Sequence, residues 1–177
     1  DDAASLTRAA GGIDVVVHAA SRLSDWGAPE TFHRENVLAT ENVIAACRAA
    51  GVRRLVYLSS LTVLGLPRDG RSIDERAPLG PPRAGDRYTA SRRLAEDRVR
   101  SAHGLGNLTT VVVRSGAIWG PGDATILPRV VRLLSGGRMP LVGEGENLLG
   151  LSHVENLSQG LALAVEVAGA AGEVFHV

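Results

Sequence analysis

Apolar runs alternate with helical patterns along this chain, and this alternation limits the fold more than any other feature. Short runs rich in valine, isoleucine and leucine cover residues 13–19, 55–59, 109–114 and 174–177. Runs that are apolar throughout are typical of parallel strands buried on both faces. The sequence therefore predicts an α/β fold, in which helices cover both faces of a doubly wound parallel sheet.

Local signals place helices between these strands. Pro29 suits the first turn of a helix that continues to about Ala50, and Gly51 is a good terminator. Asp86 can cap a second helix, over residues 88–103. Three further elements are expected: a helix over residues 125–134, a short strand near Leu141 and a helix over 154–168.

Residues 66–87 interrupt the alternation with a stretch rich in proline, glycine and charged residues. This composition predicts a long surface loop. A structureless loop of that length in a compact domain usually has a function, so this one could serve as a lid over a site.

The composition argues against several kinds of partner. Acidic and basic residues balance at 19 each, so nothing indicates nucleic acid or a membrane surface. No apolar run approaches the ~18 residues that span a bilayer, and no metal site is expected. The single Cys47 cannot form an internal disulfide, which favours a reducing, cytoplasmic compartment. All the basic residues are arginines.

Two short segments could support proton transfer. Leu58-Ser59-Ser60 ends a strand, and Tyr88 lies four residues before Arg92 on a helix, so the two side chains share a face. A neighbouring cation favours the phenolate and lowers the pKa of a tyrosine from about 10. Ser60 could then hold a substrate oxygen while Tyr88 exchanges the proton. The alternative is an ordinary helical surface pair and ordinary turn chemistry at the serines.

Six groups of residues occur in an order and at spacings shared with one known family. They are Val17-His18-Ala19-Ala20; Asn36-Val37 with Thr40 and Asn42; Leu58-Ser59-Ser60 with Val63 and Gly65; Tyr88 to Arg92; Arg114 with Gly120-Pro121-Gly122-Asp123; and His153-Val154-Glu155-Asn156. On these residues the chain resembles the extended short-chain dehydrogenase/reductases, the group of NAD-dependent epimerase/dehydratases and 3β-hydroxysteroid dehydrogenases. The resemblance implies a Rossmann-like sheet.

The resemblance also implies a set of site residues. Ser60 matches the family's catalytic serine or threonine, Tyr88 its acid/base, and Asn36 the asparagine of the helix before the serine strand. Arg92 occupies the position of the lysine that holds the nicotinamide ribose of NAD or NADP. The implied cofactor contacts are Ala19, Ala20, Ser59, Tyr88, Arg92, Ser115, Gly116, Ala117 and Ile118.

The chain departs from the family pattern in three respects. Arginine replaces the lysine, and its planar fork bonds in a different geometry. Ser115 stands where members often have proline. The glycine-rich phosphate loop and the residue that separates NAD from NADP are missing. We therefore expect an N-terminally truncated fragment, in which residues 1–123 are the rest of the dinucleotide-binding domain and 124–177 include part of a small C-terminal substrate-binding region.

The residues near the expected site favour a hydrophobic alcohol or ketone as the small-molecule substrate, of the 3β-hydroxysteroid or β-keto-acid type. Leu64 and Leu148 stand where nucleotide-sugar members commonly have tyrosine and arginine. The segments at 24–27 and 119–123 look most like the hydroxysteroid-type members. An apolar pocket could be lined by Trp26, Trp119, Leu64 and Leu66, or these residues could be ordinary packing.

Several alternatives stay open. The same catalytic set serves nucleotide-sugar epimerases and dehydratases, and a non-catalytic NAD(P)-binding sensor could keep the fold without the lysine. His18 is expected to be a packed histidine at a strand end, and His153 a structural hydrogen-bonding residue. The resemblance further implies a homodimer through the helices that begin near Thr31 and Tyr88.

Overall fold

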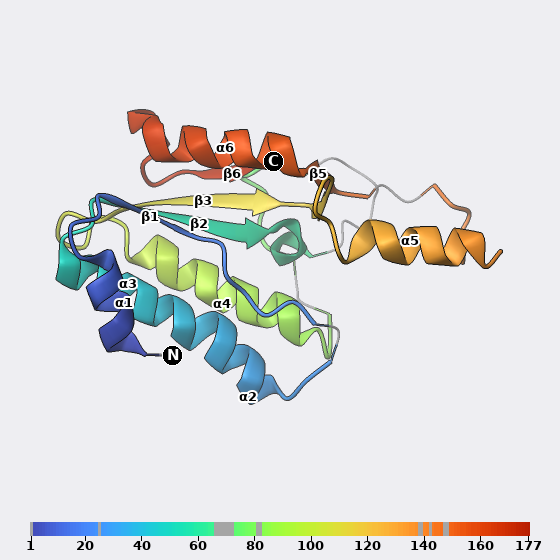
Figure 1. The fold of residues 1–177 in the computed structure, drawn as a ribbon, viewed down its shortest axis with the longest axis horizontal. Helices are drawn as coiled ribbons and strands as arrows, with labels where there is room; N and C mark the ends of the chain where they lie inside the picture. Colours follow the sequence, from blue (N-terminus) through green and yellow to red (C-terminus); the bar gives the residue numbers. More distant parts are fainter. Residues whose placement is uncertain are drawn as a thin grey trace.

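Four parallel strands form the central sheet, in the order β1-β2-β3-β6 (Figure 1). They are β1 (Val15–His18), β2 (Arg54–Ser60), β3 (Thr109–Ser115) and β6 (Val174–His176). The computed structural model describes residues 2–24, 26–65, 73–80, 83–137, 140–141, 143–146 and 149–177. The parallel order confirms the predicted α/β fold, and all four predicted strands lie within one or two residues of their expected bounds.

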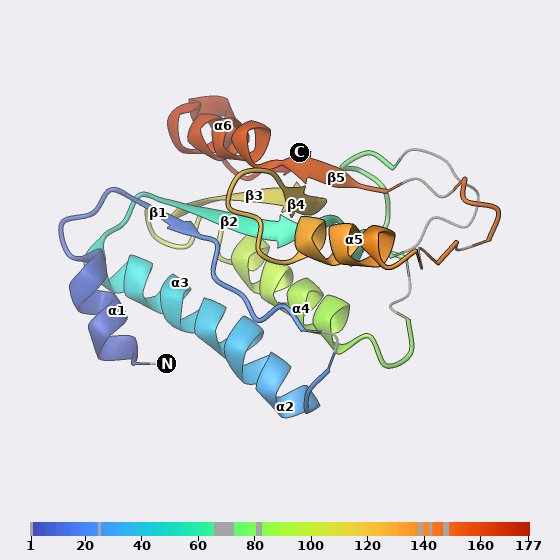
Figure 2. The ribbon, with the colours of Figure 1, turned by 45° about the vertical axis from the view of Figure 1, so that its right-hand side comes forward.

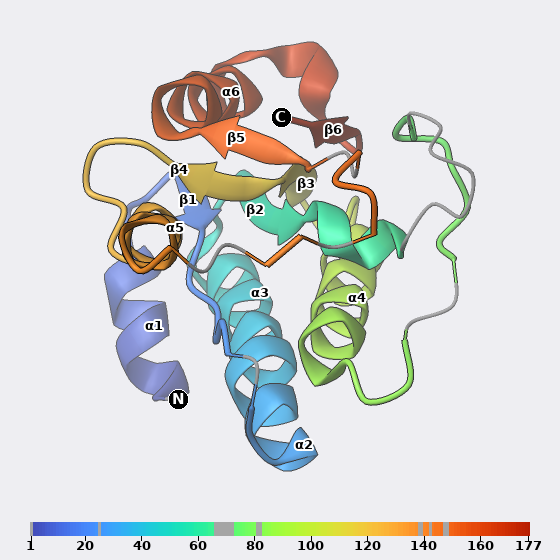
Figure 3. The same cartoon turned by 90° about the vertical axis from the view of Figure 1, so that its right-hand side faces the viewer.

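Helices cover both faces of this sheet, as Figures 1 and 3 show. One face carries α1 (Ala3–Ala10), α3 (Ala39–Ala50) and α4 (Arg87–Ser101), and the other carries α6 (Val154–Glu166). Because side chains alternate along a strand, β2 contributes to both cores. Leu55 and Tyr57 pack with α3 and α4, whereas Val56 packs with α6.

The helix predicted over 29–50 is continuous but not uniform. It consists of α2 (Pro29–Phe32), the π-helical segment η1 (His33–Leu38) and α3. Gly51 ends it with a φ of 75°, the left-handed conformation that glycine adopts readily. Asp86 caps α4 as predicted, since its side chain accepts a hydrogen bond from the Thr89 N–H at 2.9 Å.

A second, two-stranded sheet lies beyond the carboxyl ends of β2 and β3 (Figure 2). It pairs β4 (Ala117–Trp119) with β5 (Leu151–His153), and α5 (Ile126–Ser135) lies beside it. The pairing needs a glycine at Gly116, because a Cβ there would lie 2.3 Å from the Gly150 carbonyl oxygen. Two short 3₁₀ turns complete the elements, η2 (Leu61–Leu64) and η3 (Ala168–Ala170).

One expected element is wrong and others were not expected. Leu141 is not in a strand and its side chain is 74% exposed, whereas the strand of this region, β5, begins ten residues later. A strand needs a hydrogen-bonding partner, and the partner of β4 is the segment that begins at Leu151. The elements α1, β4 and η1 were not predicted from the sequence. Leu66 and Leu148 lie outside the described residues, as does part of the predicted loop at 66–87.

Within the part of the chain that the structure describes, no helix combines the length and the apolar character needed to cross a bilayer.

Candidate functional site

The predicted site lies where β2 ends and α4 begins, at the carboxyl edge of the sheet. Tyr88, Arg92 and Glu96 follow one another at intervals of four on α4, so they share one face of the helix. The two buried members bond to β2: Arg92 donates to the Leu58 carbonyl oxygen, and Glu96 accepts from the Ser59 hydroxyl at 2.6 Å. These contacts fix α4 against the strand that carries Ser60.

Ser60 is the half-buried last residue of β2, and its hydroxyl caps η2. The Ser60 Oγ accepts hydrogen bonds from the Thr62 N–H at 3.2 Å and from the Thr62 hydroxyl at 3.0 Å. A serine hydroxyl has one donor proton besides its two lone pairs. Its proton therefore remains available for a substrate oxygen, as the predicted role requires.

Tyr88 is half-buried at the start of α4, and its backbone is held from the neighbouring helix. The Ser91 hydroxyl donates to the Tyr88 carbonyl oxygen at 2.8 Å and accepts from the Asn36 side-chain amide at 2.9 Å. Asn36 is 1% exposed and lies in η1, and its side-chain oxygen accepts from the Arg22 N–H at 2.7 Å. The amide group of Asn36 thus holds the backbone around Tyr88.

Arg92 is buried, with only 2% of its surface exposed. Its guanidinium carbon lies 4.8 Å from the centroid of the Tyr57 ring, and its Nη2 donates to the Leu58 carbonyl. The Nε and Nη1 atoms have no hydrogen-bond partner among the residues that the structure describes. Buried donors are normally paired, so these two N–H groups are suited to a ligand oxygen.

His18 and Tyr57 form the wall beside Arg92, with their ring centroids 5.5 Å apart. The Thr40 hydroxyl donates to the Asn36 carbonyl oxygen, so toward His18 it can only accept. The Nε2–H of His18 therefore donates to the Thr40 oxygen at 3.0 Å. Burial, and then the charge of Arg92, lowers the pKa of His18 to about 4. His18 is therefore a neutral, packed histidine, as predicted.

Tyr57 is a second buried tyrosine in this region, and it stays protonated. Burial raises the pKa of its phenol to about 12, although the charge of Arg92 opposes this shift. Tyr57 and His18 are both neutral, so the charge among these three residues is that of Arg92.

A buried ion pair beside the site was not anticipated from the sequence. Arg114 and Glu96 are each 2% exposed, and the Arg114 Nη2 lies 2.5 Å from the Glu96 carboxylate. Ser59 donates to the same carboxylate, so the hydroxyl of Ser59 is committed to structure and only its backbone remains for the predicted cofactor contact. The sequence feature that could have indicated a charged contact here is the position of Glu96, four residues after Arg92 on the same helix face.

The network continues toward the predicted loop. The Nε2 of His176 lies 3.3 Å from the Arg114 Nη1, and the His176 backbone N–H donates to Glu75 at 2.9 Å. This backbone hydrogen bond is the main cause of a lowered pKa for the Glu75 carboxyl. The described part of the loop is thus bound to the end of β6.

The other predicted cofactor residues lie at the same edge of the sheet. Strand register pairs Ser60 with Ser115, and Ala19 and Ala20 follow β1 with exposed side chains. After Ser115 the chain is fixed to β5: the Gly116 N–H donates to the Ser152 hydroxyl at 2.8 Å, and the Ala117 N–H donates to the Gly150 carbonyl at 2.8 Å. Ala117 is exposed and Ile118 half-buried.

The residues expected to line an apolar pocket have different environments. Leu64 is buried, Trp26 is 84% exposed, and Leu66 lies outside the described residues. Trp119 packs edge-on against His153, with ring centroids 4.8 Å apart. His153 also caps α6 by accepting from the Glu155 N–H at 3.4 Å, which confirms its structural role.

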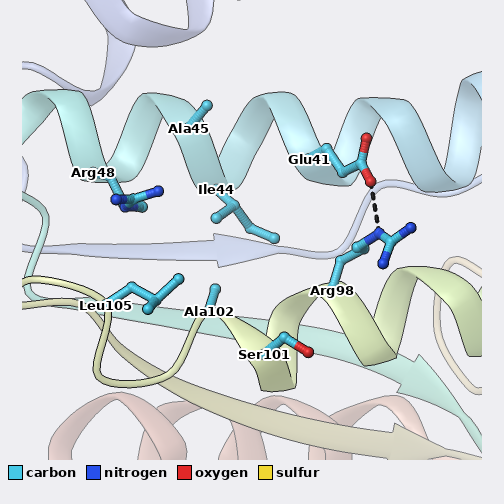
Figure 4. A pocket seen from close by; sticks show the side chains of 8 residues that line it. All are labelled: Glu41, Ile44, Ala45, Arg48, Arg98, Ser101, Ala102 and Leu105. Carbon is cyan, nitrogen blue, oxygen red and sulfur yellow. Dashed lines mark hydrogen bonds and ion pairs between the residues drawn. The ribbon is translucent and has the colours of Figure 1, made fainter.

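A hollow between α3 and α4 contains none of the predicted site residues (Figure 4). An ion pair between Glu41 and Arg98 bridges the two helices there at 2.7 Å. The remaining lining residues are Ile44, Ala45, Arg48, Ser101, Ala102 and Leu105. This hollow therefore belongs to the outer helical surface and not to the chemistry at the sheet edge.

Comparison with known proteins gives consistent matches. A family model described as "3-beta hydroxysteroid dehydrogenase/isomerase family" matches residues 1–169. The chain is 36% identical over 183 residues to 2-alkyl-3-oxoalkanoate reductase of Stenotrophomonas maltophilia, covering 99% of the chain and 54% of the relative. It is 40% identical over 173 residues to 4-hydroxy-2-methyl-3-oxo-4-farnesyl-3,4-dihydroquinoline-1-oxide ketoreductase of Stigmatella aurantiaca, covering 98% and 51%.

Solved structures share the fold. DesIV, a dTDP-glucose 4,6-dehydratase from Streptomyces venezuelae with NAD and TYD bound, superposes with a TM-score of 0.85 at 31% identity, covering 99% of this chain and 55% of that one. MoeE5 in complex with UDP-glucose and NAD gives a TM-score of 0.84 at 26% identity, covering 100% and 61%. The chain spans about half the length of the relatives it matches.

Proposed function

The chain belongs to the 3-beta hydroxysteroid dehydrogenase/isomerase family, and we propose that its protein is an NAD(P)-dependent oxidoreductase. In this proposal it interconverts a hydrophobic secondary alcohol and the matching ketone, of the 3β-hydroxysteroid or β-hydroxy/keto-acid type. One observation carries the proposal. One helical turn after Tyr88, on the helix that bonds to the strand of Ser60, lies a buried guanidinium in which two nitrogen atoms have no partner among the described residues.

The site residues divide the proton chemistry among them. In the oxidative direction, the Ser60 hydroxyl donates to the substrate oxygen and orients it, while the Tyr88 phenolate takes the hydroxyl proton. Arg92 places a positive charge one helical turn after Tyr88. NAD(P)⁺, when bound, accepts the hydride that leaves the carbinol carbon. In the reductive direction Tyr88 returns the proton to the carbonyl oxygen.

The residues present fit the nicotinamide end of the cofactor. The unpartnered Nε and Nη1 of Arg92 are suited to the ribose hydroxyls. Ala19, Ala20 and the segment 115–118 would border the ring at the same sheet edge, together with the backbone of Ser59. Asn36 acts in this proposal by holding the backbone around Tyr88.

The preference for an apolar substrate is supported by the names of the relatives, which are reductases of 2-alkyl-3-oxoalkanoates and of a farnesylated quinoline oxide. A second candidate is a nucleotide-sugar dehydratase or epimerase, because DesIV is 31% identical over 99% of this chain. Leu64, where nucleotide-sugar members commonly have tyrosine, favours the apolar substrate.

The test uses the full-length protein with NADH or NADPH and a 2-alkyl-3-oxo acid, an oxosteroid or dTDP-glucose. We expect loss of absorbance of the reduced nicotinamide with an apolar ketone. Tyr88→Phe should lower the rate by about 10²–10⁴-fold, as expected for removal of a general acid, while NADH binding followed by fluorescence persists. Tight cofactor binding without turnover of any substrate would indicate a sensor, and turnover of dTDP-glucose alone would indicate the sugar enzyme.

We further propose that residues 124–177 contribute to the substrate-binding region through α5. The side chains of Leu127, Val131 and Leu134 form one exposed apolar row on this helix, at intervals that share a face. Val131→Asp should raise KM for an apolar ketone more than it lowers kcat. An unchanged KM would exclude this role.

A homodimer is proposed through the surface of η1, α3 and α4. Leu38, Leu94 and Leu105 are 42%, 45% and 47% exposed on or near these elements, and the hollow of Figure 4 lies between the two long helices. Leu94→Glu should convert a dimer to a monomer in sedimentation of the full-length protein at micromolar concentration. A wild-type monomer under those conditions would exclude the dimer. The single, buried Cys47 is consistent with the proposed cytoplasmic location.

A further inference from the structure

The guanidinium of Arg92 is held on two sides by residues of β2. The ring of Tyr57 lies against it, 4.8 Å from ring centroid to guanidinium carbon, and the carbonyl of Leu58 accepts from its Nη2. We propose that Tyr57 and the Leu58 carbonyl form a seat built for arginine, so that Tyr57 is a positioning residue for Arg92 and lysine cannot take its place. This inference rests on the function proposed above and concerns the same site.

The covalent shape of arginine explains the seat. A guanidinium is flat, so it can lie against an aromatic ring while its edges donate hydrogen bonds in fixed directions. One edge reaches the Leu58 carbonyl, which leaves Nε and Nη1 free of protein partners among the described residues. The position and direction of these two donors are therefore set by Tyr57 and Leu58.

A lysine would meet the seat differently. Its Nζ lies as far along the side chain as the Cζ of arginine, so it ends one bond short of the atom that reaches Leu58. An ammonium is also a compact point charge whose three donors are not held in one plane. Lysine at this position would keep the charge but lose either the ring contact or the hydrogen bond, and with it the fixed donor pair.

Among the residues that the structure describes, no carboxylate pairs with Arg92. Glu96 is the carboxylate one turn along α4, and it is bonded to Arg114 and Ser59. On the opposite side His18 is neutral because its pKa is lowered to about 4. The positive charge is therefore available to a ligand.

The test compares four variants of the full-length protein in ketone reduction and in NADH binding. Arg92→Lys restores the residue of the family, and Tyr57→Leu removes the ring. Each should lower kcat/KM at least tenfold and weaken NADH binding, because each loses the fixed pair of donor atoms. The double variant should be no worse than Arg92→Lys, because the ring acts through the arginine. Tyr57→Phe keeps the ring and should recover the function that Tyr57→Leu loses.

Arg100→Lys is the matched control, since Arg100 lies exposed on the same helix, two turns after Arg92. The inference is overturned if Arg92→Lys is as active as the wild type, or if Tyr57→Leu folds and keeps the activity and the NADH affinity of the wild type. Should Tyr57→Leu not fold, Arg92→Lys alone decides. If the wild type reduces no ketone, the proposed function fails, and the seat is then judged by whether Arg92→Lys weakens NADH binding while Arg100→Lys does not.

Discussion

Two arginines, Arg92 of α4 and Arg114 of β3, are equally buried between α4 and the sheet. Their contacts differ. Arg114 and Arg92 are each 2% exposed. Arg114 bonds to the Glu96 carboxylate through both Nε and Nη2. Arg92 has an aromatic ring and one backbone carbonyl, and its Nε and Nη1 have no partner within the described part of the chain.

The difference indicates two roles. The charge of Arg114 stabilises the fold, whereas the charge of Arg92 is available to a ligand. A buried ion pair is costly to break because the remaining partner keeps its desolvation penalty. An uncompensated buried cation carries that penalty already in the folded protein, so a fold that retains it does so for another reason. Of these two buried arginines, the one without a carboxylate partner in the described part of the chain is Arg92, one helical turn after Tyr88.

The largest effect is expected from breaking the Arg114 pair. Glu96→Gln keeps the shape of the side chain but leaves Arg114 without a counter-charge. We expect the free energy of unfolding to fall by about 3–5 kcal/mol, the range for a broken buried pair. Urea denaturation followed by circular dichroism measures this change.

Glu35→Gln is the control for that substitution. Glu35 pairs with Arg22 and Arg34, but the Glu35 side chain is 34% exposed, so its loss should lower the free energy of unfolding much less than Glu96→Gln does. Equal losses in the two variants would contradict the distinction between buried and exposed pairs.

The burial of His18 beside the charge of Arg92 should also appear in the pH dependence of stability. The pKa of His18 is about 4 in the folded protein, against an ordinary value of 6.5. The unfolded chain therefore binds more protons between these pH values. Stability should be complete above about pH 6.5 and fall by about 3 kcal/mol as the pH drops to 4, at about 1.36 kcal/mol per pKa unit.

Denaturation of the wild type and of His18→Gln from pH 4 to 7 checks this expectation. The difference between the two curves isolates His18 from the carboxyl groups that titrate in the same range. Parallel curves would mean that His18 is protonated in the folded state without cost.

A smaller effect is expected from Arg92→Met. The variant loses the ring contact and the bond to Leu58, but it also loses a buried charge, so the free energy of unfolding should change by about 1 kcal/mol or less. Arg114→Met, by contrast, leaves Glu96 unpaired. Measured by urea denaturation, equal destabilisation of the two variants would remove the contrast between the arginines.

The smallest effect is expected from breaking an ion pair that is exposed to solvent. Arg98 pairs with Glu41 across the hollow of Figure 4, and the two side chains are 53% and 38% exposed. Arg98→Ala should lower the free energy of unfolding by about 0.5 kcal/mol, with less effect at high salt. A loss that matches Glu96→Gln would show that exposure does not separate these pairs.

Periodicity alone predicted much of the fold. Apolar runs located all four strands of the main sheet, and Pro29, Gly51 and Asp86 marked helix ends correctly, because these signals act through neighbouring residues. The strand expected at Leu141 was wrong, since β5 depends on a partner strand more than thirty residues away. The π-helical segment η1 was not predicted, even though the hydrogen bond that the Thr40 hydroxyl donates to the Asn36 carbonyl joins residues only four apart.

The candidate site shows the same division. Spacing on α4 placed Tyr88 and Arg92 on one helix face, and strand ends placed Ser60 and Ser115 at one sheet edge, as found. Which residues Arg92 contacts could not be read from spacing. The ring of Tyr57 and the carbonyl of Leu58 meet it only after α4 packs on β2.

The amino-acid sequence by itself determined the α/β alternation, the helix ends and the residue types at the sheet edge, since these follow from local conformational preference and burial. Only the tertiary structure decided which charges are paired. Glu96 lies one helical turn after Arg92, a spacing that would suit an ion pair between them. The packing of α4 on the sheet instead pairs Glu96 with Arg114, and Arg92 lies against the ring of Tyr57. Ion pairing in a buried site depends on ångström distances between elements, which no pattern along the chain specifies.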